Sequence, residues 1–244
     1  MSLLKAENIT KAYDGEKIIE DINIELENGQ IVSLLGVSGV GKTTLFNILS
    51  GLQEPDSGTV SLNGKNIAGK PGEISYMLQK DLLLPHMKII DNVSLPLVIQ
   101  GLKKKEARAR ADKLFAEFGL DGYQYKYPSQ LSGGMRQRAA FLRTYMSSKG
   151  VALLDEPFSA LDALTKASMH KWYLDIMDKI HMSTIFITHD IDEAIKLSDK
   201  IYVLSGKPGK VVAEIHIDNN LKHTDNIEFS PEFITYKRTI LSAL

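Results

Sequence analysis

The chain is 244 residues long and 43% hydrophobic, which allows one large domain or two small ones with a sizeable buried core. Its 29 lysines and arginines nearly balance its 30 aspartates and glutamates, so the net charge of -1 argues against a protein held to nucleic acid mainly by charge. The absence of cysteine excludes disulfides, thiolate metal sites and cysteine nucleophiles, and the lack of disulfides fits a reducing compartment.

The first residues, 1–15, lack the apolar segment of a secretory signal, so we expect that the chain is not exported. Further along, the longest apolar runs fall far short of the roughly 20 residues that span a bilayer. Any membrane role is therefore expected to depend on a partner protein.

The first predicted strands are antiparallel. Apolar residues alternate with polar ones between the turn pairs Asp14-Gly15 and Asn28-Gly29, namely Ile18, Ile22, Ile24 and Leu26. Residues 31–36 are then a short apolar run typical of a buried strand. Helical spacing follows from residue 42 and ends at Gly51, a residue suited to a helix C-terminus. A strand, a loop and a helix are therefore predicted in succession.

Residues 82–149 have a helical pattern, clearest at 103–118, where one apolar face ends at Gly119. That face holds Ala107, Ala111, Leu114, Phe115 and Phe118. Residues 151–155 and 184–188 are apolar runs typical of parallel strands joined by a crossover helix, and residues 201–217 alternate like strands. No periodicity is clear in the last 25 or so residues.

The pattern predicts an α/β fold with a mainly parallel sheet, an N-terminal antiparallel β subdomain and a helical insertion. We expect one domain of three parts. The core and β subdomain occupy residues 1–81 and 150–218, the helical subdomain residues 82–149, and a tail residues 219–244.

A phosphate-binding loop is predicted between the strand at 31–36 and the helix that follows. The loop matches GxxxxGK followed by Ser or Thr, the Walker A pattern, in the residues Gly36, Val37, Ser38, Gly39, Val40, Gly41, Lys42 and Thr43. Its glycines let backbone N–H groups and the helix N-terminus face phosphate oxygens. Lys42 is expected to reach the β and γ phosphates of a nucleotide, and Thr43 to ligate Mg²⁺.

Two carboxylates follow the apolar strand at 151–155. Asp155 ends the strand and Glu156 comes next, at the edge where open α/β sheets bind ligands. Asp155 is placed to hold Mg²⁺, and Glu156 to polarise an attacking water molecule. A kinase also has such a loop and aspartate, so these two motifs leave the reaction open.

A second glycine-rich turn lies at the start of a predicted helix, about 20 residues before the acidic strand end. It reads Leu131-Ser132-Gly133-Gly134-Met135-Arg136-Gln137-Arg138. Ser132 can cap the helix, and the two glycines leave N–H groups exposed to an anion. The chain thus has two phosphate-binding turns and one phosphate lysine.

At these residues the sequence resembles the ABC ATPase family, whose signature motif is LSGGQ. The motifs match in order over residues 13–189. The resemblance implies a P-loop fold and a head-to-tail dimer with two ATP molecules. Each ATP would lie between the loop from Gly36 to Thr44 of one chain and the turn of the other, where Ser132, Gly133, Gly134 and Gln137 would contact the nucleotide.

The resemblance implies four further roles. Gln79 corresponds to the Q-loop glutamine, which touches Mg²⁺ or the attacking water, and residues 159–162 correspond to the D-loop at the dimer interface. His189 corresponds to the switch histidine, which contacts the γ phosphate, and Tyr13 to an aromatic residue that stacks on adenine. Val40, Thr43 and Met135 depart from the usual residues, but none of these changes removes a catalytic group.

The resemblance implies a transporter subunit that hydrolyses ATP with Mg²⁺ on the cytoplasmic side of the membrane. It would be held there by permease subunits docked near Gln79 and residues 82–99, and would work with an extracytoplasmic solute-binding protein. Residues 154–165 and 205–218 resemble the nitrate, sulfonate and taurine importers, a group that includes uptake systems for thiamine-precursor pyrimidines. Alternatives are an exporter subunit, a non-transport ABC ATPase and a nucleotide-binding regulator without turnover.

Overall fold

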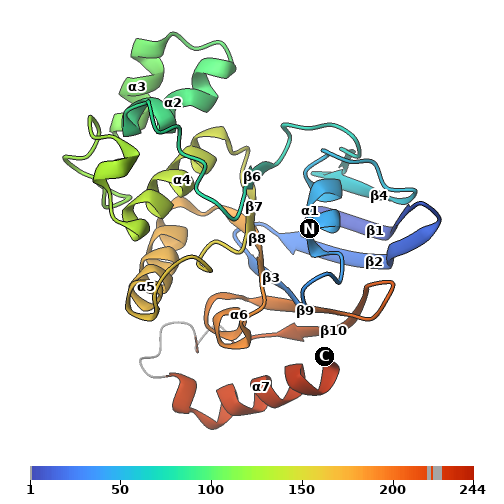
Figure 1. Cartoon of the computed structure of the whole chain (residues 1–244). Helices are drawn as coiled ribbons and strands as arrows, with labels where there is room; N and C mark the ends of the chain where they lie inside the picture. The colour runs from blue at the N-terminus through green and yellow to red at the C-terminus, as the bar shows by residue number, and fades with distance from the viewer. Residues whose placement is uncertain (1, 219–220, 222–226) are drawn as a thin grey trace.

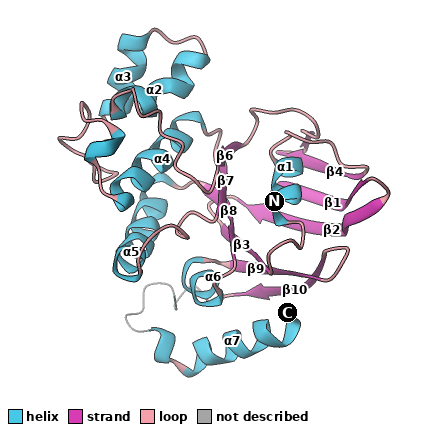
Figure 2. Ribbon diagram, in the orientation of Figure 1, coloured by secondary structure: helices cyan, strands magenta, loops and turns pink. Residues whose placement is uncertain are grey.

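Two β-sheets lie at the centre of the computed structural model, which describes residues 2–218, 221 and 227–244. The smaller sheet has four strands and the larger has six, and helices cover both sides of the larger one (Figure 1). Figure 2 shows that most helices lie on the side opposite the smaller sheet. The predicted α/β class, with separate antiparallel and mainly parallel strands, is confirmed.

The smaller sheet is antiparallel, with the strand order β2-β1-β4-β5. Its strands are β1 (Ser2–Tyr13), β2 (Glu16–Glu27), β4 (Ser57–Leu62) and β5 (Lys65–Asn66). The predicted hairpin turn is confirmed at Asp14-Gly15, where both residues have positive φ. The predicted alternation is wrong at its start, because Asp21, with φ 52°, shifts the register and buries Ile19 fully instead of Ile18.

The larger sheet has the strand order β10-β9-β3-β8-β7-β6, and β10 is antiparallel to β9 whereas the other pairs are parallel. Its strands are β3 (Ile31–Gly36), β6 (Ser75–Met77), β7 (Val151–Asp155), β8 (Ser183–Thr188), β9 (Lys200–Ser205) and β10 (Lys210–His216). Helix α5 (Ala163–Ile180) is the predicted crossover between β7 and β8. The predicted parallel strands at 151–155 and 184–188 are confirmed, and the predicted buried strand at 31–36 is parallel to β8.

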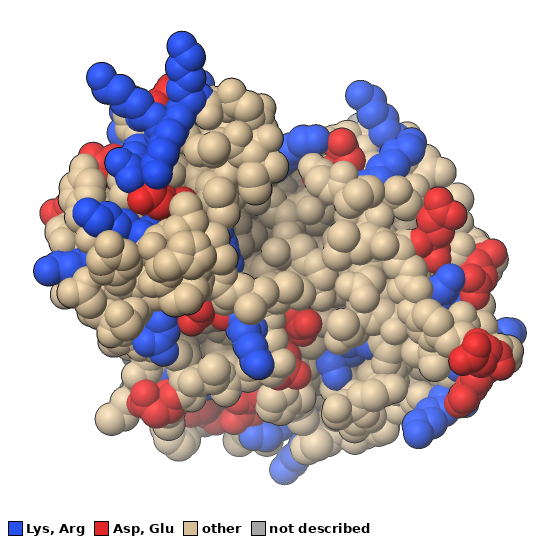
Figure 3. Space-filling view, turned by 45° about the horizontal axis from the view of Figure 1, so that its top comes forward, with Lys and Arg blue, Asp and Glu red and all other residues tan. Residues whose placement is uncertain are grey.

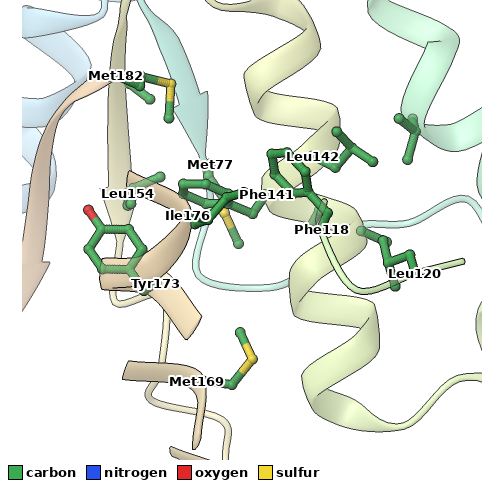
Figure 4. Packing of buried hydrophobic residues seen from close by; sticks show 14 of the residues in the cluster. Met77, Phe118, Leu120, Phe141, Leu142, Leu154, Met169, Tyr173, Ile176 and Met182 are labelled. Carbon is green, nitrogen blue, oxygen red and sulfur yellow. The ribbon is translucent and has the colours of Figure 1, made fainter. Parts of the chain in front are cut away.

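Alternate residues of the parallel strands face two separate hydrophobic clusters. In β7, Leu153 faces the cluster that contains α1 (Lys42–Leu49), and Leu154 faces the cluster that contains α4 (Gly133–Ser147) and α5. Figure 4 shows Leu154 of β7 and Met77 of β6 packed beside Phe141 and Tyr173 from those two helices. Close packing on both faces fixes where the carboxyl ends of the strands lie.

The segment between β6 and β7 is helical, with α2 (Ile89–Ile99), α3 (Lys104–Asp112), a short 3₁₀ turn (Pro128–Gln130) and α4. The helix predicted over 103–118 is wrong in extent, because α3 ends at Asp112 and residues 113–119 form successive tight turns. The predicted apolar face is still directed inward. Phe115 and Phe118 are fully buried, and Phe118 packs on Phe141 of α4 with the ring centres 6.1 Å apart.

The last helices lie beside the β9–β10 hairpin. They are α6 (Ile191–Leu197), a 3₁₀ turn (Ile227–Phe229) and α7 (Pro231–Ala243). Helix α7 buries Phe233 and Ile240 in a cluster with α6 and β10, and two buried residues make only a weak periodic signal in the sequence. Of the predicted tail at 219–244, residues 219–220 and 222–226 lie outside the described residues.

Candidate functional site

The predicted phosphate loop joins β3 to α1, as the sequence pattern requires. Gly39 and Gly41 have φ of 82° and 102°, which glycine adopts without strain. A Cβ atom on Gly36 would lie 2.5 Å from the carbonyl oxygen of Leu204, and one on Gly41 would collide with Ile19. Glycine is therefore favoured by the backbone conformation at Gly39, by the lack of space at Gly36, and by both at Gly41.

Lys42 lies in the first turn of α1, and its side chain is turned back onto the loop. Its Nζ donates hydrogen bonds to the carbonyl oxygens of Gly36 at 2.7 Å and Val37 at 2.9 Å. Only 7% of the residue is exposed, and this burial lowers its pKa against the opposing pull of Glu156 and Asp155. A cation at this depth needs anionic partners, which the phosphates of a nucleotide would supply.

The next residues along α1, Thr43 and Thr44, are exposed and half-buried respectively. Three other residues of the loop are exposed, Val37, Ser38 and Gly39, whereas Val40 is buried. The loop therefore presents backbone and hydroxyl groups outward while Val40 anchors it to the core.

Three predicted catalytic residues meet at the carboxyl ends of three strands. Glu156 follows β7, and its Oε1 lies 3.2 Å from Nδ1 of His189, which follows β8. Gln79 follows β6, and its Nε2 donates to Oε2 of Glu156 at 3.0 Å and reaches Ser159 at 3.4 Å. Both carboxylate oxygens of Glu156 are thus held in place by neighbouring side chains.

Asp155 lies in the residue before Glu156 and is half-buried. Its pKa is raised, first by burial and then by the negative charge of Glu156, with Tyr76 and Lys42 acting in the opposite direction. A divalent cation beside Asp155 would remove this repulsion. The predicted ligands Thr43, Gln79 and Asp155 all carry oxygen, the atom that Mg²⁺ prefers, so they fit such an ion.

Among the described residues, no group of three or more His, Cys, Asp or Glu side chains could hold a metal ion by itself. Any Mg²⁺ here would therefore need hydroxyl, amide or phosphate oxygens to complete its coordination.

The second glycine-rich turn begins α4. Ser132 caps this helix by accepting a hydrogen bond from the N–H of Met135 at 3.3 Å, and Gly133 and Gly134 are its first two residues. Gln137 is buried, and its amide nitrogen donates to the carbonyl oxygen of Pro157. The structure thus directs Gln137 toward the segment after Glu156, while its predicted contact with a nucleotide stays a prediction.

Tyr13 ends β1 on the side of the smaller sheet, with 43% of its surface exposed. Its hydroxyl donates to Oε1 of Gln53 at 2.7 Å, and Lys11 lies 5.8 Å from the centre of its ring. An exposed ring beside a cation is suited to stack on a flat base.

Tyr76 is a site residue that the sequence pattern did not single out. It lies on β6 three residues before Gln79, and its hydroxyl is 3.5 Å from Oδ2 of Asp155. Burial, together with the charge of Asp155, raises the pKa of Tyr76. Its alternation with the apolar residues of β6 resembles that of any half-buried strand residue, so the sequence carries no signal for this contact.

None of the helices in the described part of the chain has the length and hydrophobicity needed to cross a bilayer. The family model for ABC transporters matches residues 19–159.

The chain is similar to import subunits from several bacteria. It is 43% identical to the formylaminopyrimidine import ATP-binding protein ThiZ of Halalkalibacterium halodurans, over 90% of this chain and 86% of the relative. It is 37% identical to the taurine import ATP-binding protein TauB of Pseudomonas aeruginosa, over 99% and 95% of the two chains. It is 35% identical to the nitrate import ATP-binding protein NrtD of Synechocystis, over 99% and 94%.

Two solved structures share the fold. The dimeric ATP-binding cassette MJ0796 bound to ADP and phosphate in a post-hydrolysis state has a TM-score of 0.74 at 27% identity, over 88% of this chain and 99% of that one. CbiO1 of Clostridium perfringens, part of the transporter complex CbiONQ, has a TM-score of 0.81 at 25% identity, over 98% and 99%. With the two glycine-rich turns and the residues gathered at Glu156, these matches show that the chain belongs to the ABC transporter family and is an ATP-binding subunit that hydrolyses ATP.

Proposed function

We propose that this subunit drives solute import by hydrolysing ATP with Glu156 as the residue that activates water. The carrying observation is that Glu156 is held on one oxygen by His189 and on the other by Gln79. A carboxylate fixed from both sides can orient a water molecule and accept its proton, since both depend on position. His189 contacts both the carboxylate and the γ phosphate, and so fixes the position of one relative to the other.

Lys42 and the loop N–H groups bind the phosphates in this proposal. On binding, the Lys42 ammonium exchanges the carbonyl oxygens of Gly36 and Val37 for phosphate oxygens, which carry full charge. Thr43, Gln79 and Asp155 would hold Mg²⁺, which would neutralise phosphate charge. Tyr13 stacks on the base, where its ring is exposed.

The proposed active unit is a head-to-tail dimer in which Ser132, Gly133 and Gly134 of each chain contact the ATP bound to the other. Two features support it. The turn lies at the start of a 15-residue helix, whose N-terminus attracts anions. The cassette MJ0796, which shares the fold, is described as dimeric with ADP and phosphate bound.

We also propose that residues 82–149 form the subdomain that meets the permease on the inner face of the membrane. A hollow of about 640 Å³ lies there, lined by Leu95, Pro96 and Ile99 of α2 and by Arg143 and Met146 of α4. Figure 3 shows one face of the molecule with a hollow near its centre, and basic and acidic side chains on the surface around it. An apolar groove that also holds an arginine suits a short amphipathic segment of a membrane protein. An extracytoplasmic solute-binding protein would complete the system.

The solute proposed is a small polar molecule of the kind that the relatives' names give, namely nitrate, taurine or a formylaminopyrimidine. The relative with the highest identity of these three is the formylaminopyrimidine import subunit, at 43%.

The test is the variant Glu156→Gln. Gln keeps the size and polarity of the side chain but cannot accept a proton, so ATP should still bind while turnover falls by about 10²–10⁴-fold. Trapped ATP should then hold two chains together. Size-exclusion chromatography with light scattering would detect the dimer with ATP and Mg²⁺, and phosphate release would measure turnover. Glu117→Gln is the matched control, because it makes the same change at an exposed glutamate that is distant from Glu156 in the sequence.

Normal hydrolysis by a monomeric Glu156→Gln variant would overturn both the assignment of Glu156 and the shared site. Loss of turnover without a dimer would overturn the shared site alone.

A further inference from the structure

Lys166 links two segments that flank the proposed catalytic residues. It lies in the first turn of α5, one turn after Asp162, the helix N-cap that ends the D-loop. Its Nζ contacts Oδ2 of Asp190 at 3.0 Å and Oε2 of Glu193 at 3.3 Å, and both of these carboxylates belong to the start of α6. The contacts thus join the helix after β7 to the helix after β8.

Asp190 is the residue directly after His189, and it uses its two oxygens differently. Oδ1 caps α6 by accepting hydrogen bonds from the N–H groups of Asp192 at 3.0 Å and Glu193 at 3.2 Å. Oδ2 pairs with Lys166. The N–H of Asp190 donates to the hydroxyl of Thr188 at 3.0 Å, so the backbone on both sides of His189 is held.

The charges around Lys166 are partly removed from water. Glu193 is 3% exposed, so its carboxylate needs a close cation. From α5, His170 also faces Glu193, but its Nε2 lies 3.6 Å from the carboxylate, beyond hydrogen-bonding distance. Burial lowers the pKa of Lys166, but the hydrogen bond with Asp190 and the charge of Glu193 outweigh it and raise that pKa. Lys166 therefore stays charged and holds both carboxylates at neutral pH.

We propose that Lys166 is a positioning residue for ATP hydrolysis, which sets the distance between His189 and Glu156 by tying Asp190 to the helix that begins at the D-loop. The inference depends on the proposed role of His189 at the γ phosphate. In the proposed dimer, movement of the D-loop and of α5, which follows it, would move the backbone of His189 through this ion pair. Accurate placement of His189 matters because a displacement of about 1 Å in a reacting group can cost on the order of 10²-fold in rate.

The first experiment compares four variants by steady-state phosphate release and by the affinity for ATP. Lys166→Met removes the charge but keeps much of the aliphatic stem, and kcat should fall by about 10- to 100-fold while the affinity for ATP stays within about threefold. Lys166→Arg restores a cation and should recover most of the turnover. Lys171→Met, at an exposed lysine of the same helix, should match the wild type, and His189→Ala tests the role on which the inference depends.

The second experiment separates the ion pair from the helix cap. Asp190→Asn keeps an N-cap of similar strength but loses the negative charge that Lys166 contacts. If the ion pair positions His189, Asp190→Asn should lower kcat alone, and the double variant with Lys166→Met should be no slower than the slower single variant. Thermal unfolding of each variant is measured alongside, so that a loss of folded protein is not read as a loss of kcat.

The outcomes are distinguishable. Wild-type turnover by His189→Ala would overturn the proposed role of His189. If His189→Ala is inactive but Lys166→Met turns over normally, or if the effects of Lys166→Met and Asp190→Asn multiply, the positioning role is overturned while the proposed function stands.

Discussion

The residues at the edge of the larger sheet are held by burial on both faces of the sheet, whereas the helical segment between β6 and β7 adds many charged contacts to its apolar packing. At the sheet edge, β3 and β8 are buried along their whole length, and the residues after β6, β7 and β8 meet at Glu156. In the helical segment, charged contacts are prominent. Arg108 and Lys104 of α3 contact Asp91 of α2, and Arg143 of α4 donates to the carbonyl oxygen of Leu82 at 2.7 Å.

The difference bears on the proposal that two chains share each ATP site, and on which part of that site one chain would build alone. Burial on both faces of a sheet gives a fixed position to Lys42, Glu156 and His189, as the proposed proton transfer within one chain would require. The turn at Ser132 lies on α4, whose links to the loop after Gln79 are directional polar contacts such as Arg136 with Asp81 at 3.2 Å. Such contacts can rearrange at small cost, which would suit a turn that contacts the partner's ATP in the proposed dimer.

The largest expected effect comes from damaging the two parts of the proposed ATP site, the phosphate loop and the turn at Ser132, in different chains. Lys42→Ala removes the phosphate cation, and Ser132→Asp keeps the helix cap but places a carboxylate against the partner's phosphates, so each variant alone should lose about 10²–10³-fold in turnover. In an equimolar mixture of the two variants, about half of the dimers contain one chain of each. Each such dimer has one intact site of its two, so about a quarter of the wild-type phosphate release should return.

Ser132→Asn is the matched control, since asparagine caps a helix without adding charge. It should keep most of the turnover. A Ser132→Asp variant as active as the wild type would place this turn outside the ATP site and break the comparison.

A smaller effect is expected for Asp91→Asn, which tests whether charge holds the helical segment. Asp91 is 9% exposed by side chain, and its partners Lys104 and Arg108 are 60% and 36% exposed. The variant should lose about 1–3 kcal/mol of unfolding free energy at pH 7, less than a fully buried pair would. Chemical denaturation followed by circular dichroism measures the loss. ATP turnover per folded chain should change little.

The same variant makes a prediction about pH. Burial raises the pKa of Asp91, but the hydrogen bonds from Arg108 and Lys104 outweigh it and lower that pKa below the usual value. A lowered pKa contributes stability above the unfolded-state value, about 4, and this contribution is lost as the pH falls through the folded-state value. The wild type should therefore approach the stability of Asp91→Asn below about pH 4. Glu106→Gln, in the exposed pair with Arg110, should cost less than about 0.5 kcal/mol at any pH.

The smallest expected effect is on the affinity for ATP when Tyr13, at the end of β1 in the smaller sheet, is replaced. Tyr13→Ala removes the exposed ring and should weaken ATP binding by about 1–2 kcal/mol with kcat unchanged, since stacking acts on the bound base in ground and transition states alike. Tyr13→Phe loses only the hydrogen bond to Gln53 and should bind ATP almost as well as the wild type. If Tyr13→Ala binds ATP as tightly as the wild type, the adenine base must stack on another surface.

Local patterns in the sequence predicted the features that depend on neighbouring residues. The strand at 31–36, the glycine turn and the helix from Lys42 follow from an apolar run, conformational freedom and helical spacing, all within 20 residues. The strands at 151–155 and 184–188 follow from their hydrophobicity alone. The extent of α3 could not be predicted in this way. Phe115 and Phe118 continue the apolar spacing of the helix, but they lie in turns that also bury their side chains.

Tertiary structure decided the distances that make the site. Gln79 and Glu156 are 77 residues apart, and His189 and Glu156 are 33 apart, yet they meet because β8, β7 and β6 are neighbours in one parallel sheet and end at the same edge. The inward direction of Gln137 and the pairing of Lys166 with Asp190 depend on the packing of α4 and α5 in the same way. A sequence pattern shows the hydrophobic period of each helix or strand separately. The order of the strands in the sheet depends on how the apolar faces of all the elements are buried against one another.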